Sequence, residues 1–523
     1  MPRPTRPLIV TLDFGTAAAK AALIDVNGDV VAVGAAPYPL VSAADGRATQ
    51  SPADWLHAAQ NAIAECLEEA PEQVGAVRAR LAGFGITGQM QDLVLLPATT
   101  PADLSRPDAL GDAVLYRDTR AGDEAAHLRG ALPQWTRSCG NPQDETSCAA
   151  MWLRLVRTDD PRVDEARRIV FGPAGYLAWA LGLGAWCDQT TAVTTGLARH
   201  DGLAWLPDVA EAAHLPQRLL PGLLGEDFAA IGRLSRPSAD LMGLPEGIPV
   251  VLAPGTAGTT TLGIIGAAQR RPYVFVGDSG WLAQAIPDAP AQPDGLHVAL
   301  PMPAGLGQAP YVGAGTSILQ VARLASVGAT ARWGQHALLG DATPAGADAA
   351  LAQWEAHHGR VPTGLLTLPG LAGERFPVAD PALTGAIVGM TPETDAVTMY
   401  RGVLEGVAFA LRHAVDQLGE DDDQVLPIAG GCTESTPWMR IIADVVGLPV
   451  ARVSEGDATL VGAALATATA LGMTHRIRPL ADRPGADVIA PDPQASAAYD
   501  PLVGAHRRLY ALVQELDDKD ALR

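Results

Sequence analysis

Residues 8–20 read LIVTLDFGTAAAK, an apolar run that ends in the polar turn Asp13-Phe14-Gly15-Thr16. Residues 21–36, AALIDVNGDVVAVGAA, continue with two apolar runs joined at Asn27-Gly28. An Asn-Gly pair between alternating apolar residues is a strong signal for a tight β-hairpin. The sequence therefore predicts that the chain opens with a strand, a Gly/Thr turn and a hairpin.

Strands and helices are mixed throughout the rest of the chain. Apolar spacing predicts helices over residues 52–69, 137–156, 161–183, 394–418, 437–446 and 502–516, and strands over 81–87, 250–252, 273–276 and 425–429. This mixture is typical of an α/β fold in which helices cover a sheet.

The length of 523 residues exceeds one ordinary core, and residues 215–249 are rich in proline and glycine, as a linker is. We therefore expect two domains, residues 1–247 and 248–490. The remaining residues, 491–523, are expected to form a C-terminal helix that packs back on the body.

The bulk composition limits the possible partners. The chain has 37 Lys and Arg against 58 Asp and Glu, a formal charge of −21, which disfavours nucleic acid and anionic membranes. The five cysteines form no C-x-x-C pair, so neither a disulfide framework nor a zinc site is expected. No apolar run approaches about 18 residues, the length that spans a membrane. We expect a cytoplasmic protein with no nucleic-acid or membrane partner.

The first turn carries groups that suit a phosphate. Gly15 lets backbone approach a ligand closely, Thr16 offers a hydroxyl and Lys20 a cation, and Asp13 could hold Mg²⁺ through water. Ligands of α/β folds bind at such strand ends. A hairpin turn with a surface Asp explains the same residues equally well.

Two later strands also end in turns of small residues, Gly277-Asp278-Ser279-Gly280 and Gly430-Gly431-Cys432. Glycine serves any turn that needs a positive φ, so each could be turn chemistry alone. Three such turns in one chain suggest a nucleotide cleft between two halves, with phosphates on the first two turns and the base on the third.

Residues 88–92, GQMQD, and 116–120, YRDTR, place amides, carboxylates and guanidinium groups after buried strands. Recognition of a polyol needs such mixed donors and acceptors in fixed positions. Surface polarity and ordinary ion pairing are the alternative explanation for either segment.

Taken together and in order, these segments resemble the FGGY carbohydrate kinases, and among them the xylulokinases most closely. The residues that carry the resemblance are Asp13-Phe14-Gly15-Thr16 with Lys20, Gln50 with Trp55, Gly88-Gln89-Met90, residues 116–120, Asp188, residues 373–377, Gly430–Ser435 with Trp438, and Gly462-Ala463-Ala464. The resemblance implies two actin-like, ribonuclease-H-like domains with ATP·Mg²⁺ and a ketose in the cleft between them. It also implies a possible homodimer.

The resemblance assigns roles to the turns. It implies that phosphate and Mg²⁺ contact one set of residues and adenosine another: Asp13, Gly15, Thr16, Lys20, Gly277, Ser279 and Gly280 for the first, and Gly430, Gly431 and Ser435 for the second. The ketose would face Gln89, Met90, Gln91 and Asp118. The implied activity is the ATP-dependent phosphorylation of a ketose, such as D-xylulose or a related pentulose or polyol.

One segment departs from the family pattern. Residues 249–270, PVVLAPGTAGTTTLGIIGAAQR, contain no carboxylate, although the family takes its catalytic Asp from here. Counting back from Gly263 and Gly266 puts Thr259 at that position, and a shift of a few residues puts Thr256 there. A neutral hydroxyl cannot act as a general base near pH 7.

Three hypotheses follow from this departure. Asp278 has taken over the role of base or Mg²⁺ ligand, or the protein binds sugar or nucleotide without turnover, or it is an ATPase with another acceptor. Gln91 and Asp92 stand where the xylulokinase pattern has His and Gly, so D-xylulose in particular is not secured as the substrate.

Overall fold

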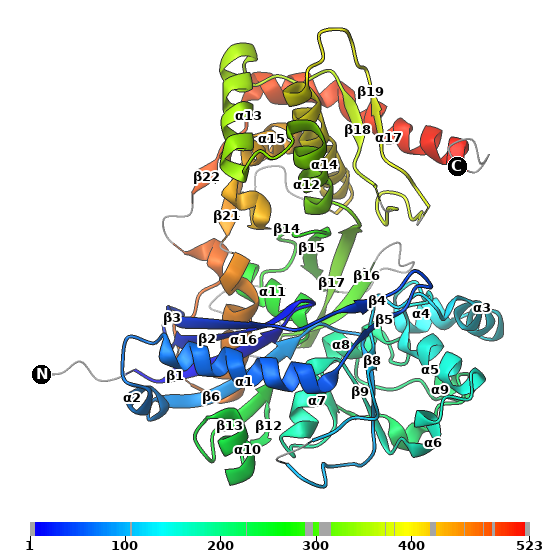
Figure 1. Cartoon of the computed structure of the whole chain (residues 1–523), viewed down its shortest axis with the longest axis vertical. Helices are drawn as coiled ribbons and strands as arrows, with labels where there is room; N and C mark the ends of the chain where they lie inside the picture. The colour runs from blue at the N-terminus through cyan, green and yellow to red at the C-terminus, as the bar shows by residue number, and fades with distance from the viewer. Residues whose placement is uncertain are drawn as a thin grey trace, which may run out of the picture. The chain divides into compact units, whose positions relative to one another are not determined.

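The computed structural model describes residues 6–104, 107–225, 227–287, 296–302, 315–371, 373–380, 382–418, 425–453, 455–473, 475–483 and 487–517. It confirms the predicted α/β fold and divides into two compact units (Figure 1). The first unit contains Met1–Gln269, Ile286–Leu319 and Gly456–Pro479, and the second contains Arg270–Ala285, Gln320–Glu455 and Leu480–Arg523. The chain thus enters the second unit after residue 269 and returns twice to the first. The boundary between the two domains that the sequence placed after residue 247 stays a prediction.

The first unit is built from two main sheets. Its strands are β1 (Leu8–Phe14), β2 (Ala18–Asp25), β3 (Val30–Pro37), β4 (Val41–Ser42), β5 (Ala48–Gln50), β6 (Leu81–Gly88), β7 (Leu93–Leu96), β8 (Ala113–Val114), β9 (Arg168–Phe171), β10 (Trp186–Cys187), β11 (Gly222–Leu223), β12 (Ala230–Arg233), β13 (Pro249–Leu252) and β16 (Leu296–Met302). Six of them form a sheet in the order β12-β13-β6-β1-β2-β3, and five form a sheet in the order β4-β5-β8-β7-β9.

Helices cover these sheets. They are α1 (Pro52–Glu68), α2 (Val74–Arg78), α3 (Gly122–Ala131), α4 (Trp135–Cys139), α5 (Cys148–Arg157), α6 (Arg162–Glu165), α7 (Pro173–Ala180), α8 (Gln189–Thr194), α9 (Pro207–Ala212), α10 (Arg236–Met242), α11 (Thr256–Ile265) and α16 (Glu455–Ala470). Figure 1 shows α1 lying along β2 and β3, where a Cβ on Gly34 would come within 2.3 Å of Ala62 O. Glycine at this position therefore lets the helix approach the sheet closely.

The opening of the chain has the predicted form. β1 pairs antiparallel with β2, and β2 pairs antiparallel with β3. Gly28 has φ 88° in the connecting turn, a conformation that suits glycine. On its other side β1 pairs parallel with β6, which pairs parallel with β13. The carboxyl ends of β1, β6 and β13 therefore lie at the same edge of one sheet.

Two stretches predicted to be largely helical contain helices together with other structure. Residues 161–183 hold α6 and α7, with the strand β9 between them paired to β7. Residues 137–156 hold the end of α4 and most of α5, because Gly140 ends α4 in the left-handed region at φ 73° and α5 begins only at Cys148. The predicted linker over 215–249 contains β11, β12 and α10, so its prolines and glycines belong to a folded edge of the unit.

Two helices of the first unit meet through glycine. A Cβ on Gly263 of α11 would lie 1.8 Å from Ala458 O, and a Cβ on Gly462 of α16 would lie 1.8 Å from Thr259 O. Real atoms cannot approach so closely, so both positions require glycine. The backbones of α11 and α16 are therefore in direct contact.

The second unit has its own sheet and helices. Its elements are β14 (Tyr273–Val276), β15 (Gly280–Ile286), α12 (Gly328–Leu339), α13 (Pro344–His358), β18 (Leu366–Leu368), β19 (Ala386–Val388), α14 (Ala396–Leu418), β20 (Leu426–Gly430), α15 (Thr436–Val446), β21 (Val450–Val453), β22 (Val488–Ile489) and α17 (Pro493–Asp517), and the division between units falls within β17 (Gly315–Leu324). Strands β15, β14, β20, β21 and β22 lie side by side in that order. α17 includes the predicted helix over 502–516 and contacts α14, α15 and β18.

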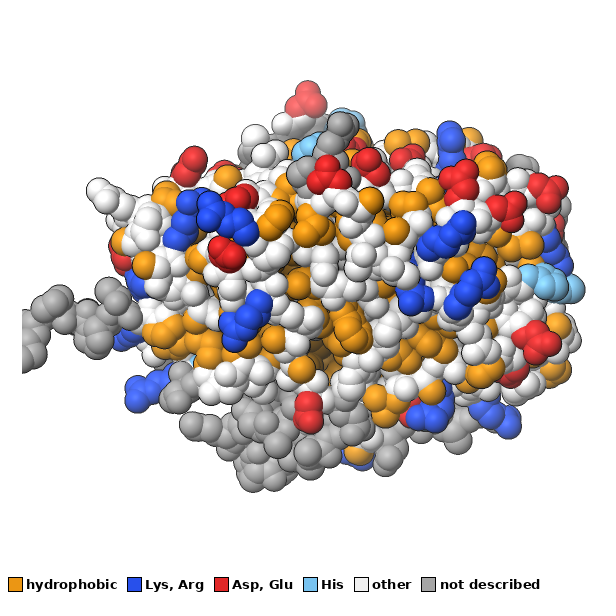
Figure 2. All heavy atoms as spheres, turned by 90° about the horizontal axis from the view of Figure 1, so that it is seen from below, with side chains coloured by type: hydrophobic (Ala, Val, Ile, Leu, Met, Phe, Trp, Pro, Cys, Tyr) orange, Lys and Arg blue, Asp and Glu red, His pale blue; other side chains and the backbone are white. Residues whose placement is uncertain are grey.

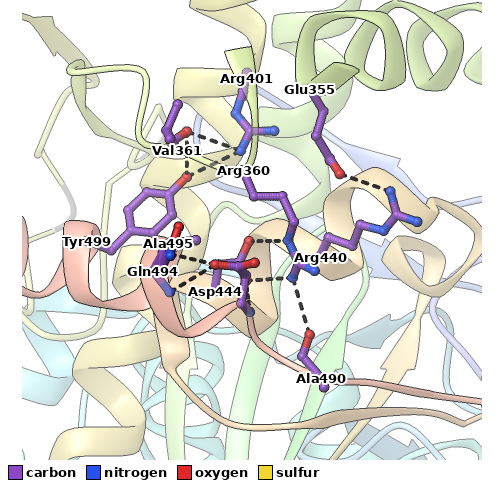
Figure 3. A network of polar contacts seen from close by, with 11 residues as sticks. Glu355, Arg360, Val361, Arg401, Arg440, Asp444, Ala490, Gln494, Ala495 and Tyr499 are labelled. Carbon is purple, nitrogen blue, oxygen red and sulfur yellow. Dashed lines mark hydrogen bonds and ion pairs between the residues drawn. The ribbon is translucent and has the colours of Figure 1, made fainter. Parts of the chain in front are cut away.

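Polar contacts with buried carboxylates connect segments of this unit, and Figure 3 shows those around Asp444. Arg360 donates to both carboxylate oxygens of Asp444, at 2.9 and 2.6 Å, and Asp444 is only 1% exposed. Arg401 and Glu405, both 1% exposed, form an ion pair at 3.2 Å, and the Tyr499 hydroxyl donates to Glu405 at 2.7 Å. The Tyr499 hydroxyl thus joins α17 to α14 across 94 residues, and the Arg360 pair joins α15 to the segment that follows α13.

A directed chain of hydrogen bonds crosses the same unit. Arg507 Nη2 donates to His413 Nδ1 (3.2 Å), so His413 carries its proton on Nε2 and donates to His506 Nδ1 (3.0 Å). His506 Nε2 then donates to Thr367 O (2.8 Å). Burial, with neighbouring positive groups at His413, lowers the pKa of His413 to about 3, and burial lowers that of His506 to about 4. Both rings are therefore neutral in the folded protein.

The surface mixes charges of both signs. Figure 2 shows acidic and basic side chains interspersed among uncharged ones on the face it presents. Among the described residues, the helices are too short or too polar to cross a membrane.

The two histidines predict how stability depends on pH. A histidine of the unfolded chain titrates near 6.5, so below that pH the unfolded state binds more protons than the folded state. The contribution of His506 to the free energy of unfolding should fall by about 3 kcal/mol as the pH drops from about 6.5 toward 4, and it is measured as the difference between wild type and a His506 variant because buried carboxyls such as Asp13 and Asp92 act in the opposite direction. Urea unfolding at several pH values measures this slope.

His506→Gln should flatten the slope while keeping a donor for Thr367 O. The exposed His57 provides the control, since His57→Gln should leave the slope unchanged. An identical slope in His506→Gln and wild type would contradict this account.

Candidate active site

The first unit holds the Asp13–Thr16 turn at the end of β1. Gly15 N donates to Ala18 O (2.9 Å), which closes the turn. The Tyr38 hydroxyl donates to Gly15 O from the end of β3. The Thr16 hydroxyl lies 3.0 Å from Tyr116 Oη. Two tyrosine hydroxyls thus contact the turn, and the sequence pattern of the turn gave no sign of either.

Gln50 joins this turn to the end of β6. Trp55 Nε1 donates to Gln50 Oε1 (3.0 Å), and because an indole N–H only donates, the orientation of the Gln50 amide is settled. Gln50 Nε2 therefore donates to Thr16 O (2.7 Å). Gln89 Nε2 donates to the same Gln50 Oε1 (3.0 Å). One amide thus connects the predicted phosphate turn with a predicted sugar residue.

Asp13 is the buried carboxyl of this turn, at 8% exposure. Thr256 Oγ1 donates to Asp13 Oδ1 (3.3 Å), and Lys20 lies opposite it on β2. Burial raises the pKa of Asp13 to about 6, while Lys20 and the Thr256 hydroxyl lower it. Among the described residues, no three His, Cys, Asp or Glu side chains gather into a metal cage. A lone carboxyl fits Mg²⁺ that keeps most of its waters.

The structure separates Thr259, which counting placed at the position of the family's Asp, from its alternative Thr256. Thr256 is the first residue of α11 and its hydroxyl faces Asp13. Thr259 lies one turn later, is 0% exposed, and its hydroxyl is 3.2 Å from Thr87 Oγ1. Thr256 is therefore the residue of α11 that lies beside the phosphate turn, and Thr259 is enclosed by protein.

Asp188 sets where α11 begins. Its Oδ1 accepts from Gly255 N and from Thr191 N, each at 2.9 Å, so one carboxyl caps α8 and also binds the N–H of Gly255, the residue before α11. Burial raises the pKa of Asp188, and these hydrogen bonds lower it. Met90 packs at the same place, since a Cβ on Gly255 would lie 2.4 Å from its sulfur. Met90 therefore contacts the start of α11.

Two predicted sugar residues have protein partners. Gln91, at φ 70°, donates from Nε2 to Thr146 O (2.6 Å) and lies 3.1 Å from Thr146 Oγ1. Asp118 is 2% exposed and accepts from Arg120 Nη2 (2.7 Å) and from Ala48 N (3.0 Å). Ion pairing therefore accounts for Asp118 without a sugar.

Asp92, which stands where the family pattern has Gly, is 0% exposed. Its Oδ1 accepts from Tyr116 N (3.0 Å), whereas its Oδ2 makes no hydrogen bond to any described residue. Burial raises the pKa of Asp92 to about 8, although the hydrogen bond from Tyr116 lowers it. The carboxyl is therefore mostly protonated at neutral pH.

In the second unit, the predicted Gly277–Gly280 turn connects β14 and β15. Gly328 N donates to Gly277 O (2.9 Å), and Ala329 N donates to Asp278 O (3.1 Å), so the start of α12 binds the carbonyl groups of the turn. A Cβ on Gly328 would lie 2.3 Å from Gly277 O. Gly277, Ser279 and Gly280 thus form a compact turn at the end of a strand, as predicted.

The Asp278 side chain points away from the protein. It is 75% exposed and forms an ion pair with Arg332 of α12, which is 62% exposed. Arg332 lies 54 residues further along the chain, and no local pattern in the sequence signals it. The carboxylate of Asp278 therefore has a cationic partner of its own.

The third turn follows β20. Gly430 has φ 110°, and its Cβ would lie 2.1 Å from Val276 O, so strand packing alone requires glycine there. A Cβ on Gly431 would meet open space. Ser435 Oγ accepts from Trp438 N (3.2 Å) as the cap of α15 and donates to Asp348 Oδ1 (2.6 Å). Of the three predicted adenosine residues, Gly431 alone is left without a structural role.

Family models match both parts of the chain. The N-terminal domain of the FGGY family of carbohydrate kinases matches residues 8–264, and its C-terminal domain matches residues 303–471.

Similar proteins span nearly the whole length. The xylulose kinase of Bacillus subtilis is 23% identical, with 97% of this chain and 98% of that protein covered, and the xylulose kinase of Escherichia coli is 26% identical, with 96% and 98% covered. A glycerol kinase of Alkalilimnicola ehrlichii is 25% identical, with 91% and 92% covered. A solved kinase of Brucella ovis, described as a "xyloylose kinase", superposes with TM-score 0.80 at 25% identity, covering 97% and 100%. The fold is thus the actin-like, ribonuclease-H-like fold that the sequence implied.

The cap at Asp188 yields a test of how α11 is held. Asp188→Ala removes the acceptor for two buried N–H groups and should lower the free energy of unfolding by about 1–3 kcal/mol. Asp188→Asn keeps a side-chain oxygen at that position and should lose much less. Urea unfolding of both variants checks this, and equal losses would show that the carboxyl does not act as a cap.

Proposed function

Because the chain belongs to the FGGY family of carbohydrate kinases, we propose that it transfers the γ-phosphoryl group of ATP to a hydroxyl of a ketose, as a xylulokinase does. The observation that carries the proposal is the Asp13–Thr16 turn, which Tyr38, Gln50 and Tyr116 hold beside a buried carboxyl. Similarity to xylulose kinases over nearly the full length supports a ketose as acceptor. A small polyol is the neighbouring possibility, since glycerol kinases are also similar.

The proposal divides the binding work between the turns. Phosphates and Mg²⁺ would meet Asp13, Gly15, Thr16, Lys20, Gly277, Ser279 and Gly280, and adenosine would meet Gly430, Gly431 and Ser435. The acceptor would face Gln89, Met90 and Gln91. Asp118 belongs to this set with less support, because its carboxylate is already paired with Arg120.

The proposed reaction lacks an evident general base for the acceptor hydroxyl. Phosphoryl transfer needs the acceptor hydroxyl to lose its proton, and Thr256 offers a neutral hydroxyl at the start of α11. Absence of one general base typically costs about 10²–10⁴-fold in rate, while positioning and electrostatic stabilisation remain. We therefore expect a slow kinase.

The primary test is ADP release by the full chain with ATP·Mg²⁺ over a panel of pentuloses, hexuloses and glycerol. Ketose-dependent ADP release supports the proposal, and ADP release without any acceptor indicates an ATPase. Thermal stabilisation by ATP and a ketose without ADP release would instead favour a protein that binds sugar and nucleotide but no longer turns over.

Restoring a carboxylate tests which threonine stands at the place of the base. Thr256→Asp should raise kcat by about 10²-fold or more, because it supplies a base beside the phosphate turn. Thr259→Asp is the matched control: it buries an unpaired carboxylate and should lower stability without raising kcat. A gain in Thr259→Asp and none in Thr256→Asp would reverse this assignment.

Asp278→Asn tests whether this residue has replaced the base or the Mg²⁺ ligand. If it has, kcat should fall by about 10²-fold or more, or the Mg²⁺ concentration needed for half-maximal rate should rise several-fold. Asp341→Asn, at an exposed position beyond α12, is the control for the loss of one surface charge. Equal kinetics in Asp278→Asn and wild type would leave Asp278 as the partner of Arg332 only.

A further inference from the structure

The first unit contains a small cavity whose three arginines have no role in the proposed kinase site. It has a volume of about 160 Å³ and lies between the 118–121 segment, the end of α5 and the turn before α6. Its polar lining consists of three arginines, two aspartates and one threonine: Arg120, Arg154, Arg162, Asp118, Asp160 and Thr158. The charged groups that line the cavity therefore carry one net positive charge, in a chain whose formal charge is −21.

Both carboxylates of the cavity are already engaged. Asp118 accepts from Arg120 Nε and Nη2, at 3.0 and 2.7 Å. Asp160 accepts from Arg162 Nε and Nη2, at 2.9 and 2.8 Å. Each pair is a two-point contact between a guanidinium and a carboxylate. Within each pair the positive charge of the arginine therefore balances the negative charge of the aspartate.

Arg154 supplies the excess charge. Its guanidinium makes no hydrogen bond or ion pair with any described residue, although the side chain is half-buried and lines the cavity. Arg120 Nη1 is likewise outside the contacts with Asp118. Two sets of N–H donors from different segments are therefore available to one occupant, and no carboxylate is left to satisfy them.

We propose that this cavity binds the phosphate group of a small anion, with Arg154 as its main contact and Arg120 as its second. A guanidinium presents parallel N–H donors that match two phosphate oxygens. One water takes about 30 Å³ in the liquid, so the cavity volume of about 160 Å³ equals that of about five waters, which is ample for one phosphate group. The occupant is either inorganic phosphate or the phosphate group of an ester whose remainder extends to solvent.

The cavity is connected to the phosphate turn through a short segment. Asp118, which pairs with Arg120, also accepts from Ala48 N (3.0 Å) next to Gln50. Tyr116, two residues before Asp118, contacts Thr16 through its hydroxyl (3.0 Å). An anion that draws Arg120 toward itself would therefore act on the segment that holds the turn. The binding itself does not depend on the proposed kinase activity.

Binding is tested by calorimetric titration and thermal unfolding of the full chain with inorganic phosphate, at an ionic strength held constant with chloride. We expect Arg154→Gln to weaken phosphate binding by about tenfold to hundredfold. Arg157→Gln is the matched control, since Arg157 lies on the same helix, pairs with Glu124 and does not line the cavity. It should bind phosphate as the wild type does.

A second arm identifies the source of the phosphate. A ketose phosphate that binds more tightly than inorganic phosphate, with the same loss in Arg154→Gln, would mark an ester as the occupant. Arg154→Lys keeps the charge without the paired donors and should bind with intermediate affinity, which guards against a folding defect in Arg154→Gln. Equal phosphate affinity in wild type and in folded Arg154→Gln would overturn the proposal, as would stabilisation by chloride alone.

Discussion

The contact between the backbones of α11 and α16 is the constraint on which the first unit's candidate site depends. Gly263 and Gly462 leave no room for a Cβ, so the two helices can pack at only one depth. Asp188 then fixes the start of α11 from the other side through Gly255 N. The position of Thr256 beside Asp13 follows from these backbone contacts, and its own side chain contributes little to it. Chemistry at this position can therefore change while the geometry stays.

The polar groups around the turn form a second layer of order. The hydrogen bond from Trp55 fixes the orientation of the Gln50 amide. Gln50 then donates to Thr16 O and accepts from Gln89. Every bond in this chain has a defined donor, and none of these bonds involves a residue of α11. They can therefore hold the turn although α11 carries no carboxylate.

Much of the fold was predictable from local patterns. The hairpin at Asn27-Gly28 and the strands before each glycine-rich turn have short-range signals, and the structure confirms them. The choice between Thr256 and Thr259 was not predictable, because it depends on which face of α11 is enclosed by Thr87. The ion pair between Asp278 and Arg332 joins distant segments, so no motif could reveal it. The motif around Asp118 likewise does not reveal that its carboxylate pairs with Arg120 beside a cavity. β9 was misread as helix because its four residues take their structure from β7.

A hydroxyl at residue 256 also changes the electrostatics of occupancy. A carboxylate at the start of α11 would repel a polyphosphate held at the neighbouring turn, by about 1 kcal/mol at 4 Å in water and more in a drier site. Thr256 removes that repulsion and leaves Asp13 as the buried acid of the turn. A nucleotide bound there would dissociate more slowly. In the proposed reaction the transfer of its γ-phosphoryl group would also be slower, so the nucleotide would stay bound for longer before it reacts. In the proposed kinase, the threonine would thus slow phosphoryl transfer and lengthen the lifetime of the nucleotide-bound state together.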